Sequence, residues 1–394
     1  MNTTHHYQIC LLGCSYDSDK IIQELIKDYF VQLGISLNNL IFYDENSINE
    51  CNRKYPLSAI FFGYKGVSDS QHPIVKTLLD DSVFILPVVD DLSQFSEFIP
   101  RSLHAINGCE SSDHDRIVST ILENFRLLRP ERRLFISYKR NESQSIAIQL
   151  YEKFEASGFD VFLDTHSVAK GADFQNSLWH RLADSDIMVL LDTPGFRSSR
   201  WTKEELARAN ATNIQILHLQ WPGVKEDQES AFSVFLALNS NSFVDPMSQL
   251  DKFAEFTSTV TDEVIKKVEN LRARALAARH RYLVDNLLKQ AKELSLPATI
   301  QPDRFISLKI DNNKYIAVVP AVGIPTAERY EIFENRVKNS KGMNRFEKIW
   351  LIYDERGILQ SWINHLEWLN NHLPLVSFKV SDAKSKIDQE IKND

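Results

Sequence analysis

Short apolar runs alternate with longer amphipathic patterns along most of this chain. Apolar strands that are interleaved with helices form βαβ units around a parallel sheet. This alternation occurs in three regions of the sequence. The chain is therefore predicted to be an α/β protein, and its 394 residues predict several domains because they are too many for one ordinary core.

Changes in this pattern divide the sequence into four parts. Two α/β regions are followed by a long helical stretch, and the last region returns to strands and helices. The charged segment from Ser381 onward is expected to fray. The predicted parts are an N-terminal α/β domain at residues 1–128, a middle α/β domain at 129–245, a helical connector at 246–295 and a C-terminal α/β domain at 296–394.

The middle domain shows the alternation most strongly. Residues 134–137 have the pattern of a strand, and residues 143–158 that of an amphipathic helix with Ile146 and Leu150 on one face. Gly158 stands just past the last apolar helical position. We therefore expect Gly158 to cap the end of this helix.

Composition and charge limit the choice of partners. The chain is 43% hydrophobic and 25% charged, which is normal for a globular protein, and its net charge of −8 gives no bulk attraction to nucleic acid or anionic membranes. No apolar run has the length of a membrane span, and the first residues lack the pattern of a signal peptide. We expect a cytoplasmic protein that binds neither nucleic acid nor membrane.

The four cysteines fall in the first third of the chain, at Cys10, Cys14, Cys51 and Cys109. They have neither the CxxC spacing of a metal or redox motif nor the density of a disulfide scaffold. No cysteine and histidine pair has the spacing of zinc ligands. We expect idle thiols and no metal site.

A basic stretch at residues 272–281 lies within the helical connector. Its arginines can form a solvated helix face or pair with acidic groups elsewhere in the chain. Nucleic-acid contact is the alternative, although no aromatic residues are interleaved with the arginines. The connector could also serve as an oligomerisation element.

Two segments of the middle domain combine structural and chemical signals. Residues 134–141 are a buried strand that ends abruptly in polar residues, and residues 199–207 are a loop that turns into a helix with carboxylates on its first turns. Ligand chemistry in open α/β sheets gathers where strands end and helices begin. We therefore look for the functional site in these two segments.

Five short motifs follow one another in this region. They are LFISY at 134–138, GFDVFLD at 158–164, Gly171, DSD at 184–186, and SRW at 199–201 followed by Glu205 and Leu206. In this order and spacing they resemble a TIR (Toll/interleukin-1 receptor) domain over roughly residues 130 to 225. The resemblance implies a flavodoxin-like parallel sheet with a mobile loop after its second strand, here at 165–172, between the two flanking α/β domains.

TIR domains are either scaffolds that recruit other TIR domains or enzymes that cleave the N-glycosidic bond of NAD. In the enzymes, a glutamate four residues after a tryptophan is the catalytic carboxylate, and the matching pair here is Trp201 and Glu205. The neighbouring Glu204 is one helical step away and should point elsewhere. The resemblance thus implies NAD+ as the substrate, with no cofactor.

The chemistry explains why one carboxylate matters. Nicotinamide leaves as a neutral base, so the difficulty lies in the oxocarbenium-like ribose, whose charge a fixed carboxylate such as Glu205 stabilises. The family also implies aromatic groups beside the rings and cations near the pyrophosphate. The implied substrate-binding residues are Ser137, Tyr138, Lys139, Arg140, Asp164, Phe174 and Trp201.

Each of these residues also has a purely structural interpretation. Tyr138 and Trp201 could be core residues, because aromatic side chains are usually buried for packing. Phe174 could belong to an apolar helix face, and Lys139 and Arg140 could be ordinary surface charges. Glu205 alone could be a first-turn glutamate that is stabilised by the helix dipole.

The family resemblance extends to biological role. The chain is similar to bacterial anti-phage effectors that deplete NAD, in which sites are completed between neighbouring TIR domains. This implies a homo-oligomer with TIR–TIR contacts and an unidentified trigger that the flanking domains sense. The alternatives are a non-catalytic signalling scaffold and a cyclase that makes a cyclic ADP-ribose-type signal.

The N-terminal domain weakly repeats the middle one. Its predicted strands at 58–62 and 83–86 follow each other as those at 187–191 and 214–219 do. The stretch between them has no tryptophan and glutamate pair and instead offers Ser68, Asp69 and His72. If this domain is a diverged, TIR-like copy of the middle one, we expect it to act as a non-catalytic partner or sensor.

Overall fold

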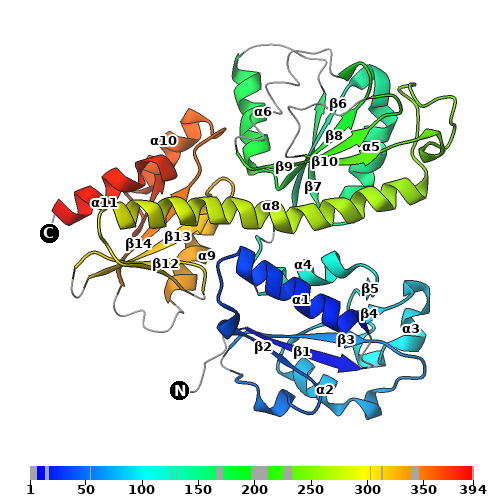
Figure 1. Cartoon of the computed structure of the whole chain (residues 1–394), viewed down its shortest axis with the longest axis horizontal. Coiled ribbons are helices and arrows are strands. Elements are labelled where there is room, and N and C mark those ends of the chain that lie inside the picture. The colour runs from blue at the N-terminus through cyan, green and yellow to red at the C-terminus, as the bar shows by residue number, and fades with distance from the viewer. Residues whose placement is uncertain are drawn as a thin grey trace. The chain divides into compact units, whose positions relative to one another are not determined.

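The computed structural model describes the chain in eleven stretches, which make up two compact units, residues 1–130 and 131–394. The predicted α/β class is confirmed, because the strands form three five-stranded sheets along the chain (Figure 1). The described residues are 7–13, 17–53, 55–125, 127–129, 131–165, 172–196, 212–224, 233–301, 303–311, 314–338 and 346–392.

The first unit contains a fully parallel sheet in the order β2-β1-β3-β4-β5. Its strands are β1 (Tyr7–Gly13), β2 (Leu40–Tyr43), β3 (Leu57–Phe62), β4 (Phe84–Val89) and β5 (Cys109–Glu110). Its helices are α1 (Asp17–Gln32), α2 (Pro73–Asp80), α3 (Phe95–Phe98) and α4 (His114–Asn124). Cys10 and Cys109 are buried, and burial raises the pKa of the Cys10 thiol to about 12.

The middle sheet has the order β10-β9-β8-β6-β7 and is also fully parallel. Numbered within its own domain, this is the order 2-1-3-4-5, and the sheet of the first unit has the same order. The weak sequence repeat therefore coincides with a shared topology. The strands are β6 (Arg133–Tyr138), β7 (Asp160–Thr165), β8 (Ile187–Asp192), β9 (Gln215–Gln220) and β10 (Val234–Ala237).

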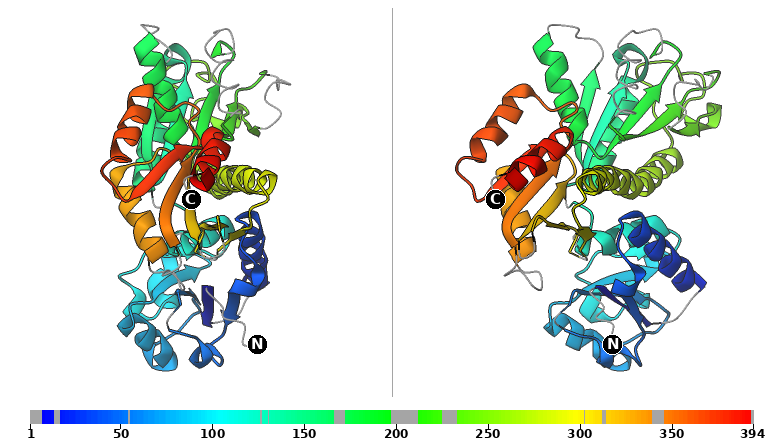
Figure 2. Two further views of the ribbon diagram at one scale, coloured as in Figure 1. Left: turned by 90° about the vertical axis from the view of Figure 1, so that its left-hand side faces the viewer. Right: turned by 60° about the vertical axis from the view of Figure 1, so that its left-hand side comes forward.

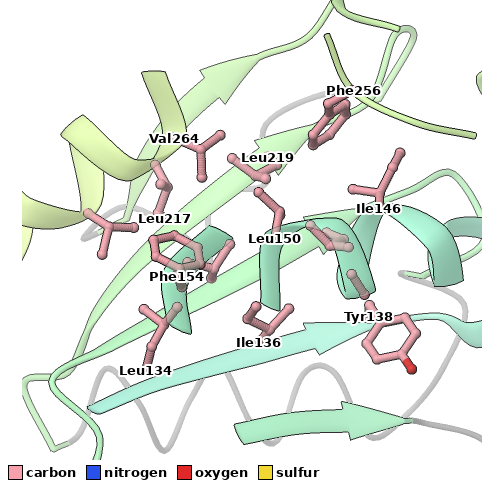
Figure 3. Close-up of a cluster of buried hydrophobic side chains, with 14 of the residues drawn as sticks. Leu134, Ile136, Tyr138, Ile146, Leu150, Phe154, Leu217, Leu219, Phe256 and Val264 are labelled. Atoms are coloured by element: carbon pink, nitrogen blue, oxygen red, sulfur yellow. The ribbon is translucent and has the colours of Figure 1, made fainter. Parts of the chain in front are cut away.

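Helices cover both faces of the middle sheet. One face packs against α5 (Arg140–Ala156), where Ile146 and Leu150 meet the apolar residues of β6 and β9 (Figure 3). The other face packs against α6 (Ala172–Asp184). Gly158 follows the end of α5 with a φ of 81°, which confirms the predicted helix cap because glycine adopts this left-handed conformation without a Cβ penalty.

The predicted helical connector contains one unbroken helix, α8 (Ser258–Glu293), of 36 residues (Figures 1 and 2). Val264 and Val268 pack into the core of the middle domain, whereas Leu283 and Leu287 pack into the core of the C-terminal domain. The two halves of α8 therefore belong to two different cores. Because a helix is stiff over this length, α8 is a shared core element rather than a flexible linker.

The arginines of α8 confirm the predicted pairing within the chain. Arg272 is fully buried, and its Nε donates to Asp186 Oδ2 at 2.7 Å. Arg279 donates to the carbonyl oxygens of Ser185 at 2.7 Å and Ala183 at 2.6 Å, at the end of α6. These two arginines are thus structural, whereas Arg274 is exposed.

The C-terminal sheet is mixed, because β11-β12-β13 is antiparallel and β13-β14-β15 is parallel. The tail does not fray at Ser381 as expected, since Ala383 and Ile387 are buried on one face of α11. The strands are β11 (Ala298–Ile300), β12 (Ile306–Lys309), β13 (Tyr315–Ala321), β14 (Phe346–Tyr353) and β15 (Leu375–Lys379). The helices are α9 (Ala327–Lys338), α10 (Gln360–Leu369) and α11 (Ala383–Lys392).

Candidate functional site

The candidate site lies at the carboxyl edge of the middle sheet. The chain passes from β6 to β7 on one side and then returns to β8 on the other side of β6. Such a reversal of strand order leaves a crevice beyond the strand ends, and open α/β sheets bind ligands there. The polar residues that follow β6 and β8 therefore share the position where a ligand is expected.

The last two residues of β6 point to opposite faces of the sheet, as strand geometry requires. Tyr138 is 3% exposed and belongs to the apolar cluster that includes Ile146 and Leu150 (Figure 3). Ser137 is fully buried and pairs with Leu190 of β8. Tyr138 is thus a core residue, as the structural alternative predicted. Its contact with substrate stays a prediction.

Lys139 and Glu142 join the start of α5 to the loop after β8. Lys139 Nζ donates to Glu142 Oε1 at 2.5 Å and to the carbonyl oxygen of Gly195 at 3.1 Å. The backbone N–H of Gly195 donates to Glu142 Oε2 at 3.0 Å. We call this set of three residues the edge lock. It ties together two loops that are more than fifty positions apart in sequence.

A kink in α5 gives the edge lock its geometry. Ser143 has φ −151° and ψ 31°, so the first turn of the helix is offset from the remainder. The N–H of Ser145 does not continue the helical ladder and instead donates to the carbonyl oxygen of Lys252 at 2.8 Å. The start of α5 is therefore bonded to the loop after β8 and to the segment that precedes α8.

The electrostatics of the edge lock favour a charged Glu142. Burial alone would raise the pKa of this carboxyl group, but the hydrogen bonds from Lys139 and the Gly195 amide help to outweigh it, and the pKa is lowered. A Cβ at Gly195 would collide with Glu142 Oε1 and Lys139 Nζ, so a side chain there would push these two flexible ends aside. The hydrogen bonds of the edge lock in their present geometry thus depend on the absence of a Cβ at this position.

A second group of polar residues lies beneath the same edge. Asp192 ends β8, and His218 lies in β9, with both residues 1% exposed. His218 Nδ1 is 3.8 Å from Asp192 Oδ2, which is beyond hydrogen-bond distance. Gln220 pairs with Asp192 in the strand register and is also buried. Buried polar side chains of β8 and β9 therefore gather near this edge.

The remaining predicted site residues are placed to different extents. Arg140 is exposed at the first position of α5. The backbone of Asp164 pairs with Ser137 at the end of β7, and Phe174 belongs to α6, but neither side chain is among those described. Trp201 and Glu205 lie outside the described residues, in the connection between β8 and β9.

Sequence reasoning missed Glu142 and Gly195. The spacing of Lys139 and Glu142, three residues apart at a helix start, is a signal for an ion pair. Their contact with Gly195 depends on the fold, because residues this distant meet only when β6 and β8 lie side by side. The Pro194-Gly195 turn is visible in the sequence, but nothing there identifies its partner.

Comparison with known proteins decides the nature of this domain. The family model described as TIR domain matches residues 134–250. Residues 134–250 form a TIR domain. The match begins in β6, contains the edge lock and His218, and spans the positions of Trp201 and Glu205. The predicted TIR fold in the middle of the chain, flanked by two α/β sheets, is therefore confirmed.

Other comparisons add little to the TIR assignment. No curated protein matches the chain. A solved structure from Clostridium difficile, described as a candidate phosphosugar isomerase, shares 12% identity over 70% of this chain and 86% of its own, with a TM-score of 0.21. A likeness this weak carries no argument about fold or function. Among the described residues, no helix is both long and apolar enough to span a membrane.

The TIR domain also displays an apolar loop between β10 and α8. Met247 is 92% exposed and Phe253 is 69% exposed, and Val244 and Leu250 also project into solvent. Although exposed, the loop is held in place, because Trp221 Nε1 donates to the carbonyl oxygen of Gln249 at 2.7 Å. Exposed apolar clusters of this kind mark interaction sites. We call residues 244–253 the apolar loop.

Proposed function

We propose that the TIR domain cleaves the bond between nicotinamide and ribose in NAD+, with Glu205 as the catalytic carboxylate. The observation that carries this proposal is the TIR match at residues 134–250, which includes a glutamate four positions after a tryptophan, Trp201. This is the spacing of the catalytic pair that the family resemblance implies.

The proposed reaction needs little acid catalysis. As the bond from ribose C1′ to the pyridinium nitrogen breaks, its electron pair neutralises the ring, and nicotinamide leaves uncharged. Positive charge develops on the ribose, and the Glu205 carboxylate stabilises it. The oxygen of a water molecule then bonds to C1′ and releases a proton, which gives ADP-ribose.

The described residues support this proposal because they hold together two loops at the carboxyl edge of the TIR sheet, where a ligand is expected. The edge lock holds Gly195, and the chain runs from there toward Trp201 and Glu205. Because Glu142 neutralises Lys139, the exposed Arg140 is the stronger candidate for the pyrophosphate of the substrate. Ser137 and Asp164 pair with each other one residue before the ends of two adjacent strands at this edge, and the resemblance assigns both to the substrate.

Self-association is part of the same proposal. Uncontrolled NAD cleavage would kill the cell, so an enzyme of this kind must stay inactive until a trigger arrives. In our account the flanking domains respond to the trigger, TIR domains of several copies come together, and cytoplasmic NAD is depleted as a defence against phage. The exposed apolar loop supports an assembly step, because its side chains lose solvent-exposed area when copies associate.

A non-catalytic scaffold is the second candidate, and the apolar loop favours it equally. A scaffold would need the fold and the self-association, but it would not need Glu205. The two candidates therefore differ in one measurable property, which is whether the carboxylate of Glu205 supports turnover.

The deciding experiment measures nicotinamide release from NAD+ by the full chain at high concentration with a crowding agent. Wild type should turn over, Glu205→Ala should not, and the neighbouring Glu204→Ala should keep its activity. Equal activity of the two variants would remove Glu205 from its role. No release by wild type, while light scattering shows assembly, would favour the scaffold.

A truncated chain can separate activity from control. It should retain residues 131–394, because α8 contributes to the cores of both the TIR domain and the C-terminal domain. Release by this fragment but not by the full chain would mean that the N-terminal domain restrains the enzyme. Equal rates of nicotinamide release by the fragment and the full chain would mean that the N-terminal domain does not restrain the enzyme.

A further inference from the structure

The N-terminal domain contains a cluster of three polar side chains at the carboxyl edge of its own sheet. Glu45 comes two residues after β2, Tyr64 comes two residues after β3, and His72 directly precedes α2. Gly13, the last residue of β1, lies between them in the sheet order. Three loops that are distant in sequence therefore meet at this edge.

Hydrogen bonds connect these side chains into a chain. His72 Nδ1 is 2.6 Å from Glu45 Oε1, and His72 Nε2 is 2.8 Å from the Tyr64 hydroxyl. A carboxylate only accepts, so Nδ1 donates to Glu45, and Nε2 on the other side of the ring is hydrogen bonded to the Tyr64 hydroxyl. His72 is 7% exposed and packs edge-on against Phe61, so the ring that orients Glu45 is itself fixed.

Glu45 is held through one oxygen only. Its Oε1 accepts from His72 and also from the backbone N–H of Gly13, at 2.9 Å. Both hydrogen bonds that the described residues make to this carboxylate end on Oε1, and the side chain is 34% exposed. Oε2 is therefore an oriented acceptor at the surface, and a ligand can meet it without disturbing the network.

The backbone at Gly13 is adapted to this arrangement. Its φ is 83°, and a Cβ at this position would collide with the carbonyl oxygen of Phe62 in the neighbouring strand. Only glycine can therefore close β1 here with its N–H directed at Glu45. The anchor of the carboxylate is built into the sheet itself.

The position of Glu45 indicates the class of ligand. In doubly wound sheets, ligands bind beyond the carboxyl ends of the strands, at the point where the strand order reverses, and an acidic residue after the second strand accepts from ribose hydroxyls. Here the order β2-β1-β3 creates that reversal, and Glu45 follows the second strand. The geometry points to a site for the ribose diol of a nucleoside at the edge of the N-terminal sheet.

The negative charge of the Glu45 carboxylate agrees with a ligand that is recognised through its ribose hydroxyls. An anchored carboxylate attracts hydroxyl donors and repels phosphate, so the diol rather than a phosphate group meets Glu45. Tyr64 is only partly buried and packs against His72, which gives a flat neighbour for a nucleobase. This inference does not depend on NAD cleavage by the TIR domain, and it assigns a ligand class to the domain expected to act as a sensor.

The test is hydrogen–deuterium exchange of the full chain with adenosine, which has the diol and no phosphate. Adenosine should slow exchange in peptides that cover residues 43–47 and 62–72, and 2′,3′-dideoxyadenosine should not. ADP-ribose is measured beside adenosine to distinguish a free nucleoside from a nucleotide. Slowing by either diol-bearing probe supports the site, whereas slowing by neither, or equal slowing by the dideoxy compound, overturns it.

A matched pair of variants locates the effect. Glu45→Gln keeps an oxygen for Gly13 and His72 but replaces the accepting Oε2 with a donating amide, so the adenosine concentration needed for half-maximal slowing should rise about tenfold or more. Glu50→Gln, at an exposed glutamate of the same domain, should leave that concentration unchanged. Unchanged slowing in Glu45→Gln would overturn the role of Glu45. The dideoxy comparison in wild type keeps the test valid if that variant fails to fold.

Discussion

The Gly195 amide and the Glu142 carboxylate are hydrogen bonded at 3.0 Å across the carboxyl edge of the TIR sheet. This bond fixes the point from which the chain leaves toward Trp201 and Glu205. The same carboxylate neutralises Lys139, one of the cations that the family resemblance assigned to substrate. Glu142, which the motifs did not single out, thus constrains Lys139, which they did.

Gly195→Ala should destabilise the TIR domain, because its Cβ would collide with both Glu142 and Lys139. We expect a loss of about 0.5–1.5 kcal/mol in the free energy of unfolding, because the two flexible side-chain ends would move aside and give up hydrogen bonds of about that size. Glu142→Ala removes one of the colliding groups, so the double variant should lose less than the sum of the single losses. Urea unfolding of the four proteins measures this, and strict additivity would refute the proposed collision.

The edge lock should weaken in acid. The pKa of Glu142 is lowered in the folded protein, so its contribution to stability is present above the unfolded pKa and lost as the pH falls through the lower folded value. The stability difference between wild type and Glu142→Gln should therefore be largest near pH 7 and shrink below about pH 4. Denaturation at several pH values measures this difference in the free energy of unfolding. A difference that became larger in acid would contradict a lowered pKa of Glu142. Glu152→Gln, on the exposed face of α5, is the control.

Arg272→Ala should be among the most destabilising single changes in the second unit. Arg272 and Asp186 are both fully buried, and removal of the guanidinium takes this ion pair away from the buried Asp186 carboxylate. Such losses cost about 3–5 kcal/mol. Arg274→Ala, two positions along the same helix at an exposed site, should change stability by less than about 0.5 kcal/mol. Similar losses of unfolding free energy in Arg272→Ala and Arg274→Ala would contradict the claim that the buried ion pair stabilises this unit.

Charges placed in the apolar loop should weaken association without unfolding the chain. Met247→Asp combined with Phe253→Asp adds two charges where side chains are mostly exposed, so the melting temperature should stay within a few degrees. Light scattering under crowding should then report smaller assemblies than wild type. Val31→Asp, at an exposed apolar residue of α1, controls for added charge alone. Assemblies of unchanged size would exclude the loop from self-association.

The alternation of apolar strands and amphipathic helices was enough to predict the fold class, and the TIR domain was implied by the resemblance that the five motifs carry. Residues 134–137 lie inside β6, and Gly158 caps α5 as its position predicted. These features depend on neighbours in sequence, which a pattern records directly. The same holds for the pairing of the basic stretch with groups in the chain, since buried arginines need acidic or carbonyl partners.

Other features depend on which distant segments meet. The contact of Glu142 with Gly195 requires the kink at Ser143 as well as the adjacency of β6 and β8. The apolar positions of α8 show that the helix is buried but not that its two halves enter different cores. In α11, Ile387 and Ala383 form a narrow apolar face that the surrounding charges concealed. The roles of Trp201 and Glu205 stay predictions.

The central claim is that Glu205 supports NAD cleavage. Its most direct test is the rate of nicotinamide release at saturating NAD+ by full-length Glu205→Ala relative to Glu204→Ala. The account predicts a ratio on the order of one hundredth or lower, as for the loss of a group that stabilises transition-state charge. A ratio near one, with both variants as active as wild type, would contradict it.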